Sequence, residues 1–178
     1  ADLEQLAIEW RASSKCVSID RAAREVLLSD GSALPYDKLI LCMGGRARQL
    51  TVPGADLPGV FVLRTLDDAL AIASLLAPGK ALVAIGGGWI GLEVAATARW
   101  KGLGATIVES EARLCARTVP SEASGFLQGM HERQGTEVLL NCSVEKIERH
   151  ATGLGVILDG GRVLAADIVV AGIGLLPN

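Results

Sequence analysis

The chain has 178 residues, of which half are hydrophobic, 21 are glycine and 3% are aromatic, and its formal net charge is −3. Such a composition is typical of an α/β protein with short turns, and the lack of a basic cluster argues against nucleic acid as a partner. No apolar run approaches the roughly 20 residues of a membrane-spanning helix, so we expect no membrane segment. The four cysteines show neither C-x-x-C nor metal-ligand spacing, which favours free thiols, no metal site and a cytoplasmic location.

Strand signals dominate the first 45 residues. The sequence predicts strands over residues 8–11, 16–19, 26–29 and 38–43, with Asp30-Gly31 as the turn after the third of them. The last run is apolar and ends in two glycines, as a buried strand would.

A crossing segment and a helix are predicted next. Residues 46–62 carry two Pro-Gly pairs, which indicate turns in a segment that crosses between two parts of the fold. Thr65 then has the side chain of a helix N-cap, and Asp68 stands three residues later, at the spacing of a capping box. We therefore predict a helix with its apolar residues over 70–76 and its end at Pro78.

Residues 81–109 have the order of elements found in a nucleotide-binding unit. An apolar run of strand length, 81–85, ends in three glycines, and a helical stretch follows up to Gly102. Residues 105–108 then form a second apolar run. Both runs are expected to be strands of a parallel sheet that is covered on its two faces.

Three glycines of this unit stand at G-x-G-x-x-G spacing: Gly86, Gly88 and Gly91. In a dinucleotide-binding turn the first glycine allows the tight turn, the second lets a pyrophosphate approach the backbone, and the third lets helix and strand pack closely. The amides at the start of the helix then favour the phosphate charge. Strand, turn, helix and strand in this order predict dinucleotide binding.

Glu109 ends the second strand, 23 positions after Gly86. An acid at this place accepts hydrogen bonds from the ribose hydroxyls of the adenosine half and repels a 2′-phosphate. The sequence therefore favours NAD over NADP, while Arg113 is near enough to keep NADP open as an alternative.

The remainder predicts another helix, a third parallel strand and an antiparallel meander. Ser121 is expected to cap a helix that ends at Gly135. Its apolar face has residues at helical spacing: Ala123, Phe126, Leu127 and Met130. Strands are expected beyond it over residues 136–140, then 144–148, 155–158 and 163–165 as the meander, and 168–171 as a last buried strand. These elements indicate an α/β, Rossmann-like NAD-binding domain with a parallel sheet plus an antiparallel three-stranded meander.

An internal repeat connects the two ends of the chain. Its members recur at an offset of 130 residues: Leu34, Asp37 and Gly44 in the first copy, and Leu164, Asp167 and Gly174 in the second. The second copy ends a unit whose glycine turn begins 88 positions earlier, at Gly86. By analogy the first copy should end a similar domain whose glycine turn lies upstream of Ala1. We therefore expect a fragment: the tail of one dinucleotide-binding domain followed by one complete domain.

Four stretches resemble one enzyme family in sequence, order and spacing: LPYDKLILCMGGRAR, PGVFVLRTLDDA, IGGGWIGLEVAATAR and ADIVVAGIGLLPN. They are similar to those of the FAD-dependent NADH:ferredoxin reductases of bacterial oxygenase and cytochrome P450 systems, in the pyridine nucleotide-disulfide oxidoreductase superfamily. The resemblance implies that NADH passes hydride to FAD, which delivers single electrons to a [2Fe-2S] ferredoxin or a similar small carrier. It also implies the C-terminal part of an FAD-binding domain over residues 1–62, an NAD-binding domain over 63–171, and a return segment to the FAD domain over 172–178.

The resemblance further assigns cofactor contacts but no catalytic acid or base, because the flavin carries the chemistry. The NAD contacts it implies are Gly86, Gly88 and Gly91 at the pyrophosphate, Trp89, Ile90 and Glu93 at the nicotinamide, Glu109 at the ribose, Arg117 over the adenosine, and Gly172, Ile173 and Gly174 on the other side of the nicotinamide. The FAD contacts it implies are Cys16, through its backbone against the adenine, and Arg64.

Other functions stay open. A disulfide reductase or an NADH oxidase of the same superfamily would share the NAD-binding unit, and a non-catalytic nucleotide-binding module would share its fold. Trp89 could cover the nicotinamide pocket or simply pack. Arg64 could be only a charge at the start of the helix, and Arg113 and Arg117 could be solvated surface charges. We expect the chain alone to bind NADH without rapid turnover.

Overall fold

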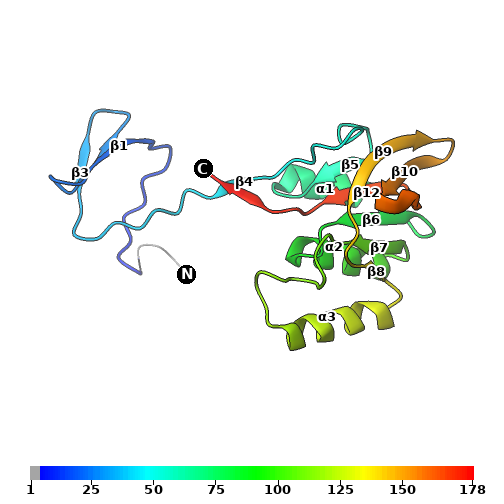
Figure 1. Cartoon of the computed structure of the whole chain (residues 1–178). Coiled ribbons are helices and arrows are strands. Elements are labelled where there is room, and N and C mark those ends of the chain that lie inside the picture. The colour runs from blue at the N-terminus through cyan, green and yellow to red at the C-terminus, as the bar shows by residue number, and fades with distance from the viewer. Residues whose placement is uncertain (1–4) are drawn as a thin grey trace. The chain divides into compact units, whose positions relative to one another are not determined.

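The computed structural model describes residues 5–178, and its contacts group the chain into two compact units with the boundary between Met43 and Gly44. The elements can be followed in chain order by the colours of Figure 1. None of the helices within residues 5–178 is long and apolar enough to cross a membrane.

The first unit contains a three-stranded antiparallel sheet in the order β1 (Cys16–Asp20), β2 (Glu25–Leu28) and β3 (Ala33–Pro35). The Asp20 carboxylate accepts the amides of Ala22 and Ala23 at 2.9 and 2.8 Å, which fixes the first turn. Gly31 takes a φ of 85° in the second turn, a conformation that glycine adopts without strain. The predicted strands over 16–19 and 26–29 and the Asp30-Gly31 turn are therefore confirmed.

Two strand predictions in the first unit are wrong. Residues 8–11 and 38–43 have no regular secondary structure, and Ile40, in the middle of the second run, is 84% exposed. β-branched and aliphatic side chains suit a strand only where a neighbouring backbone accepts its hydrogen bonds. Within residues 5–43, the sheet β1-β2-β3 includes neither run.

The second unit is built on a five-stranded parallel sheet. Its strands lie in the order β5 (Val60–Val62), β12 (Ile168–Ala171), β6 (Ala81–Ile85), β7 (Gly104–Val108) and β8 (Glu137–Leu139). Its helices are α1 (Leu66–Leu75), α2 (Trp89–Trp100) and α3 (Ser121–Arg133). The meander consists of β9 (Val144–His150), β10 (Gly153–Leu158) and β11 (Val163–Ala166), with the short 3₁₀ helix η1 (Asp159–Gly161) before β11. This arrangement confirms the predicted α/β fold.

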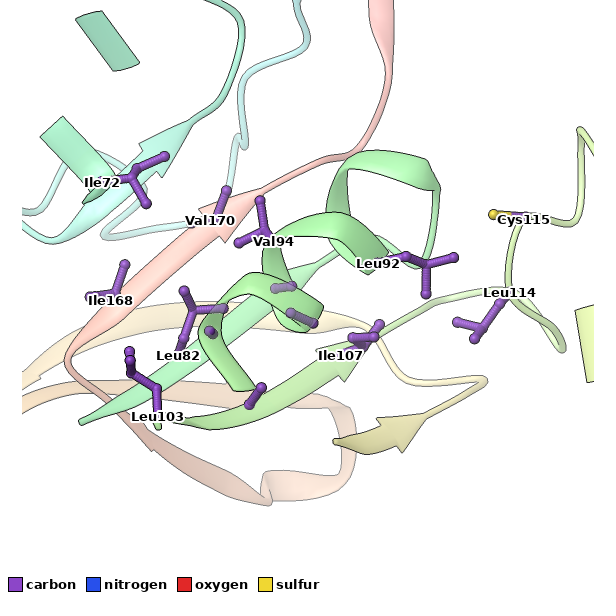
Figure 2. Close-up of a cluster of buried hydrophobic side chains, with 14 residues drawn as sticks. Ile72, Leu82, Leu92, Val94, Leu103, Ile107, Leu114, Cys115, Ile168 and Val170 are labelled. Carbon is purple, nitrogen blue, oxygen red and sulfur yellow. The ribbon is translucent and has the colours of Figure 1, made fainter. Parts of the chain in front are cut away.

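The sheet has a hydrophobic core on each face, because successive side chains of a strand point to opposite sides. On one face Leu82 and Ala84 of β6 pack with residues of the helices, and Figure 2 shows this cluster around α2. On the other face Val83 and Ile85 pack against the meander. Both faces are thus covered, which is why the strands are apolar without alternation.

The capping box of α1 is confirmed. The Asp68 amide donates to the Thr65 hydroxyl, and the Asp68 carboxylate accepts the Thr65 amide at 2.8 Å. The Thr65 and Arg64 amides, which both donate to the Asp68 carboxylate, hold the pKa of Asp68 below its ordinary value. The capping box therefore fixes the first turn of α1, which begins shortly after β5 in the chain.

Two details of α3 differ from the prediction. Its N-cap is Pro120, and no side chain caps it, so Ser121 is the first helical residue. Its buried residues are Ser124 and His131, whereas Phe126 is 65% exposed. Ser124 donates its hydroxyl to the Leu114 carbonyl, so α3 docks through a polar contact that the apolar spacing does not reveal.

A two-stranded antiparallel ribbon pairs β4 (Gly45–Ala47) with β13 (Leu175–Pro177). The Arg48 amide extends the pairing by donating to the Gly174 carbonyl at 2.9 Å. The two segments expected to cross into and out of the NAD-binding unit therefore run side by side within the second unit.

Candidate nucleotide-binding site

The glycine turn between β6 and α2 has one crowded end and one open position. Gly86 has a φ of 105°, and a Cβ there would lie 2.6 Å from the Gly172 carbonyl oxygen. A Cβ on Gly91 would lie 2.0 Å from the Gly86 carbonyl oxygen. A Cβ on Gly88 would meet no atom within 4 Å. The first and third glycines are thus required by the fold, whereas space lies open next to the second.

The start of α2 offers backbone donors that no side chain blocks. Gly88 is the N-cap, and no side chain of the described residues forms a cap hydrogen bond at this helix. Free amides at a helix start carry a partial positive charge that attracts anions. With the open space at Gly88, this end of α2 fits a phosphate-bearing group.

Glu109 stands at the carboxyl end of β7 with its carboxylate already held. Its Oε2 accepts the Gly87 amide at 2.6 Å, and its Oε1 accepts the Glu111 amide at 2.8 Å and the Ser110 hydroxyl at 3.2 Å. A carboxylate has about four acceptor positions, so one remains and a ligand hydroxyl can replace that of Ser110. The Glu109 carboxylate can therefore still accept a hydrogen bond from a ribose hydroxyl.

A cleft of about 720 Å³ brings most of the predicted residues together within the second unit. Ten of the thirteen predicted contact residues line it: Arg64, Gly86, Gly88, Trp89, Ile90, Glu109, Arg117, Gly172, Ile173 and Gly174. Its volume is in the usual range for a small-molecule site. Trp89 is 48% exposed there, so its indole is accessible to a ligand.

Three predicted residues do not line this cleft. Gly91 is buried under the turn and acts through packing. Glu93 is exposed on α2, and Cys16 belongs to the first unit, where its thiol lies 3.6 Å from the Ser18 carbonyl oxygen. The cofactor contacts of all thirteen residues stay predictions.

Arginine side chains gather near the ribbon. Arg117 Nη2 and Arg48 Nε lie 3.7 and 3.9 Å from the position that a Cβ of Gly174 would take. Arg64 donates Nε to the Gly45 carbonyl at 2.9 Å, and its Nη2 lies 3.4 Å from the corresponding position at Gly44. This positive charge suits the diphosphate of a dinucleotide such as FAD or NAD.

Sequence reasoning missed cleft residues that come from loops. Cys115 and Thr118 follow β7, and Cys142 precedes β9. Burial raises the pKa of the Cys115 thiol above its ordinary value, which makes it a packing residue rather than a nucleophile. The sequence indicates these loop residues only through their position after the carboxyl ends of parallel strands, where binding sites lie in open α/β sheets.

Among residues 5–178, no group of three or more His, Cys, Asp or Glu side chains is placed to hold a metal ion. The polar groups that line the cleft include backbone amides of the glycine turn, the carboxylates of Glu109 and Glu111, and the guanidinium groups of Arg64 and Arg117. That donor set fits an organic anion with hydroxyl groups.

Comparisons with known proteins identify the family of the chain. The family model described as "Pyridine nucleotide-disulphide oxidoreductase" matches residues 2–178. Rhodocoxin reductase of Rhodococcus erythropolis is 47% identical over 163 residues, covering 91% of this chain and 38% of that protein. The chain therefore spans about two-fifths of the length of the curated relatives it matches.

Solved structures show the same arrangement. The ferredoxin reductase for the CYP199A2 system from Rhodopseudomonas palustris superposes with a TM-score of 0.78 at 41% identity, over 99% of this chain and 44% of that one. The covalent putidaredoxin reductase–putidaredoxin complex matches with a TM-score of 0.72 at 38% identity, over 93% of this chain and 41% of that one.

Proposed function

The chain belongs to the pyridine nucleotide-disulphide oxidoreductase family, and from this premise we propose that it is the NAD-binding part of a flavoprotein reductase. Residues 63–171 form the NAD-binding domain in this proposal, residues 1–62 belong to an FAD-binding domain, and residues 172–178 return to it. The whole protein passes electrons from NADH through FAD to a ferredoxin.

One observation carries the nucleotide assignment: the space beside Gly88 is open, although Gly86 and Gly91 on either side of it are crowded. A turn that served packing alone would have no need of a glycine at the open position. Glu109 lies in the same cleft, at the end of the adjacent strand. The pyrophosphate therefore takes the place beside Gly88, and the adenosine ribose takes the place beside Glu109.

The residues of this chain bind the nucleotide cofactor and orient it. When bound, FAD supplies the two-electron to one-electron conversion. The turn and the start of α2 hold the pyrophosphate, Glu109 orients the ribose, and Arg117 covers the adenosine half. Trp89 and Ile90 line one side of the nicotinamide position, and Ile173 lines the other side. Arg64 contributes charge toward FAD.

The acceptor is a small iron–sulfur protein of the [2Fe-2S] type. Support for this part comes from relatives that are named ferredoxin reductases, and from a related reductase solved in a complex with putidaredoxin. A sharp test is the colour of the full-length protein, which should be yellow and should bleach with NADH. A colourless protein that binds NADH would instead be a non-catalytic binding module.

The nucleotide site is tested by Gly88→Val in this chain. The φ of Gly88 is −84°, and a Cβ there meets nothing within 4 Å, so the variant should fold, with no more than the modest fall in Tm expected from replacing a glycine N-cap, and should lose NADH binding in calorimetry. Gly125→Val is the matched control, since a Cβ at Gly125 on α3 also meets nothing within 4 Å. Equal NADH affinity in both variants would overturn the assigned site.

A further inference from the structure

The loop between β7 and α3 is bridged by the Arg113 side chain. Arg113 Nη1 donates to the Val119 carbonyl at 2.8 Å, and Arg113 Nη2 donates to the Ala116 carbonyl at 2.7 Å. The guanidinium is a rigid fork, so two bonds to carbonyls three residues apart fix the path of the chain between them. Arg117 lies within that bridged segment.

Other contacts attach this loop to the glycine turn. The Cys115 amide donates to the Gly87 carbonyl at 2.9 Å, and a Cβ on Gly87 would lie 2.6 Å from Leu114 Cδ2. Figure 2 shows Leu114 and Cys115 on the loop beyond β7, in the same buried cluster as Leu92 of α2. The loop therefore has a fixed base under the turn. Its outer half is held by the Thr118 and Val119 amides, which donate to the Cys115 carbonyl at 2.9 and 3.1 Å, together with the two bonds of Arg113.

The outer half of the loop forms part of the cleft wall. Ala116, Arg117 and Thr118 line the cleft, and Arg117 Nη2 reaches to 3.7 Å from the Cβ position of Gly174. Within residues 5–178, the Arg117 guanidinium forms no hydrogen bond or ion pair. The position of that charge thus depends on the backbone that carries it.

We propose that Arg113 is a positioning residue of the nucleotide site: its guanidinium bridges Ala116 and Val119 and thereby holds Arg117 over the cleft. The proposal rests on the function proposed above. It also assigns Arg113 to the loop rather than to a 2′-phosphate, because the two bonds orient the guanidinium toward the loop's own carbonyls. Loss of Arg113 should weaken NADH and NADPH by the same factor.

The first test needs no cofactor. Cys115 is 5% exposed at the base of the loop, so alkylation by iodoacetamide, mapped by mass spectrometry, reports loop opening. We expect Arg113→Met to raise the Cys115 rate about tenfold or more, and Arg113→Lys, which retains one donor group, to raise it less. The exposed Cys16 and Cys42 should react equally in all variants. Arg133→Met, at an exposed arginine of α3, is the control.

The second test measures coupling to Arg117. NADH and NADPH affinities of the single variants Arg113→Met and Arg117→Met and of the double variant are compared by calorimetry. We expect the double variant to bind NADH as the Arg117 single variant does, because Arg113 acts through Arg117. If Arg113→Met merely destabilised the structure, the fold-losses of NADH affinity in the two single variants would multiply in the double variant. Arg113→Lys should bind NADH more tightly than Arg113→Met.

Each result decides the proposal. Unchanged Cys115 alkylation in Arg113→Met, a loss confined to NADPH, or multiplied losses in the double variant would overturn it. A chain that binds no NADH while Arg113→Met still exposes Cys115 would refute the proposed function and would limit Arg113 to a role in loop folding, so the two failures are distinguishable.

Discussion

The Gly87 amide donates a 2.6 Å hydrogen bond to the Glu109 carboxylate, which ties the glycine turn to the end of the neighbouring strand. The same carboxylate accepts the Glu111 amide through its other oxygen. Glu109 is therefore oriented before any ligand arrives, and binding does not have to order its side chain.

Glu109→Ala should weaken NADH binding about tenfold or more, because a hydrogen bond to a charged group is lost. The effect on NADPH should be smaller, since the variant also removes the charge that repels a 2′-phosphate. Calorimetric titration of both nucleotides checks this, with Glu122→Ala on the exposed side of α3 as the control. Equal losses for the two nucleotides would contradict the ribose contact.

Gly91→Ala should destabilise the chain by roughly 1–3 kcal/mol, because its Cβ would overlap the Gly86 carbonyl oxygen at 2.0 Å. Thermal unfolding should show a lower Tm, by roughly 2–4 °C for each kcal/mol. Gly88→Ala is the matched control and should lower the Tm less, because its Cβ meets no atom and only the N-cap preference for glycine is lost. If both variants unfold at the same temperature, the crowding at the turn is not real.

His131 should make stability depend on pH. Burial lowers the pKa of its imidazole below 6.5 in the folded state, so below about pH 6.5 the unfolded chain binds a proton that the folded chain does not. The free energy of unfolding contributed by His131 is therefore present above that pH and is lost as the pH falls toward the folded pKa. Urea unfolding between pH 7.5 and 5 checks this.

The control for that experiment is His131→Leu, which should flatten the profile in this interval. His150→Gln changes an exposed histidine and should leave the wild-type slope. A steeper fall in His131→Leu than in the wild type would show that other groups produce the acid sensitivity.

Asp167→Ala should lower the free energy of unfolding by about 1 kcal/mol. The Asp167 carboxylate accepts the Ala81 amide at 2.8 Å, and its own amide donates to the Ala81 carbonyl, so the residue joins the starts of β12 and β6. Asp37, its counterpart in the internal repeat, forms no side-chain hydrogen bond or ion pair within residues 5–178, so Asp37→Ala is the matched control. Urea denaturation should give a free energy of unfolding about 1 kcal/mol lower for Asp167→Ala than for Asp37→Ala.

The fold of the second unit was predictable because its signals are local. Strand lengths at 81–85 and 168–171, the Thr65 cap and the glycine spacing each follow from a few neighbouring residues. Glu109 and the turn could be placed in one site because the carboxyl ends of adjacent parallel strands lie at the same edge.

What failed depended on distant partners. The run 38–43 has the residues of a strand, yet strand formation requires a pairing that no local signal supplies. The buried face of α3 is set by the bond of Ser124 to Leu114, and the role of Arg113 depends on carbonyls of a loop whose shape the sequence does not state. Single-residue spacing cannot reveal such contacts.

The contrast among the three glycines of the turn separates two kinds of selection. Random mutagenesis followed by a screen for soluble protein should discard changes at Gly86 and Gly91 and accept many at Gly88, because only the first two meet neighbouring backbone. A screen for coenzyme capture should reject changes at all three. The substitutions tolerated at Gly88 would then report what coenzyme binding requires, separately from what folding requires.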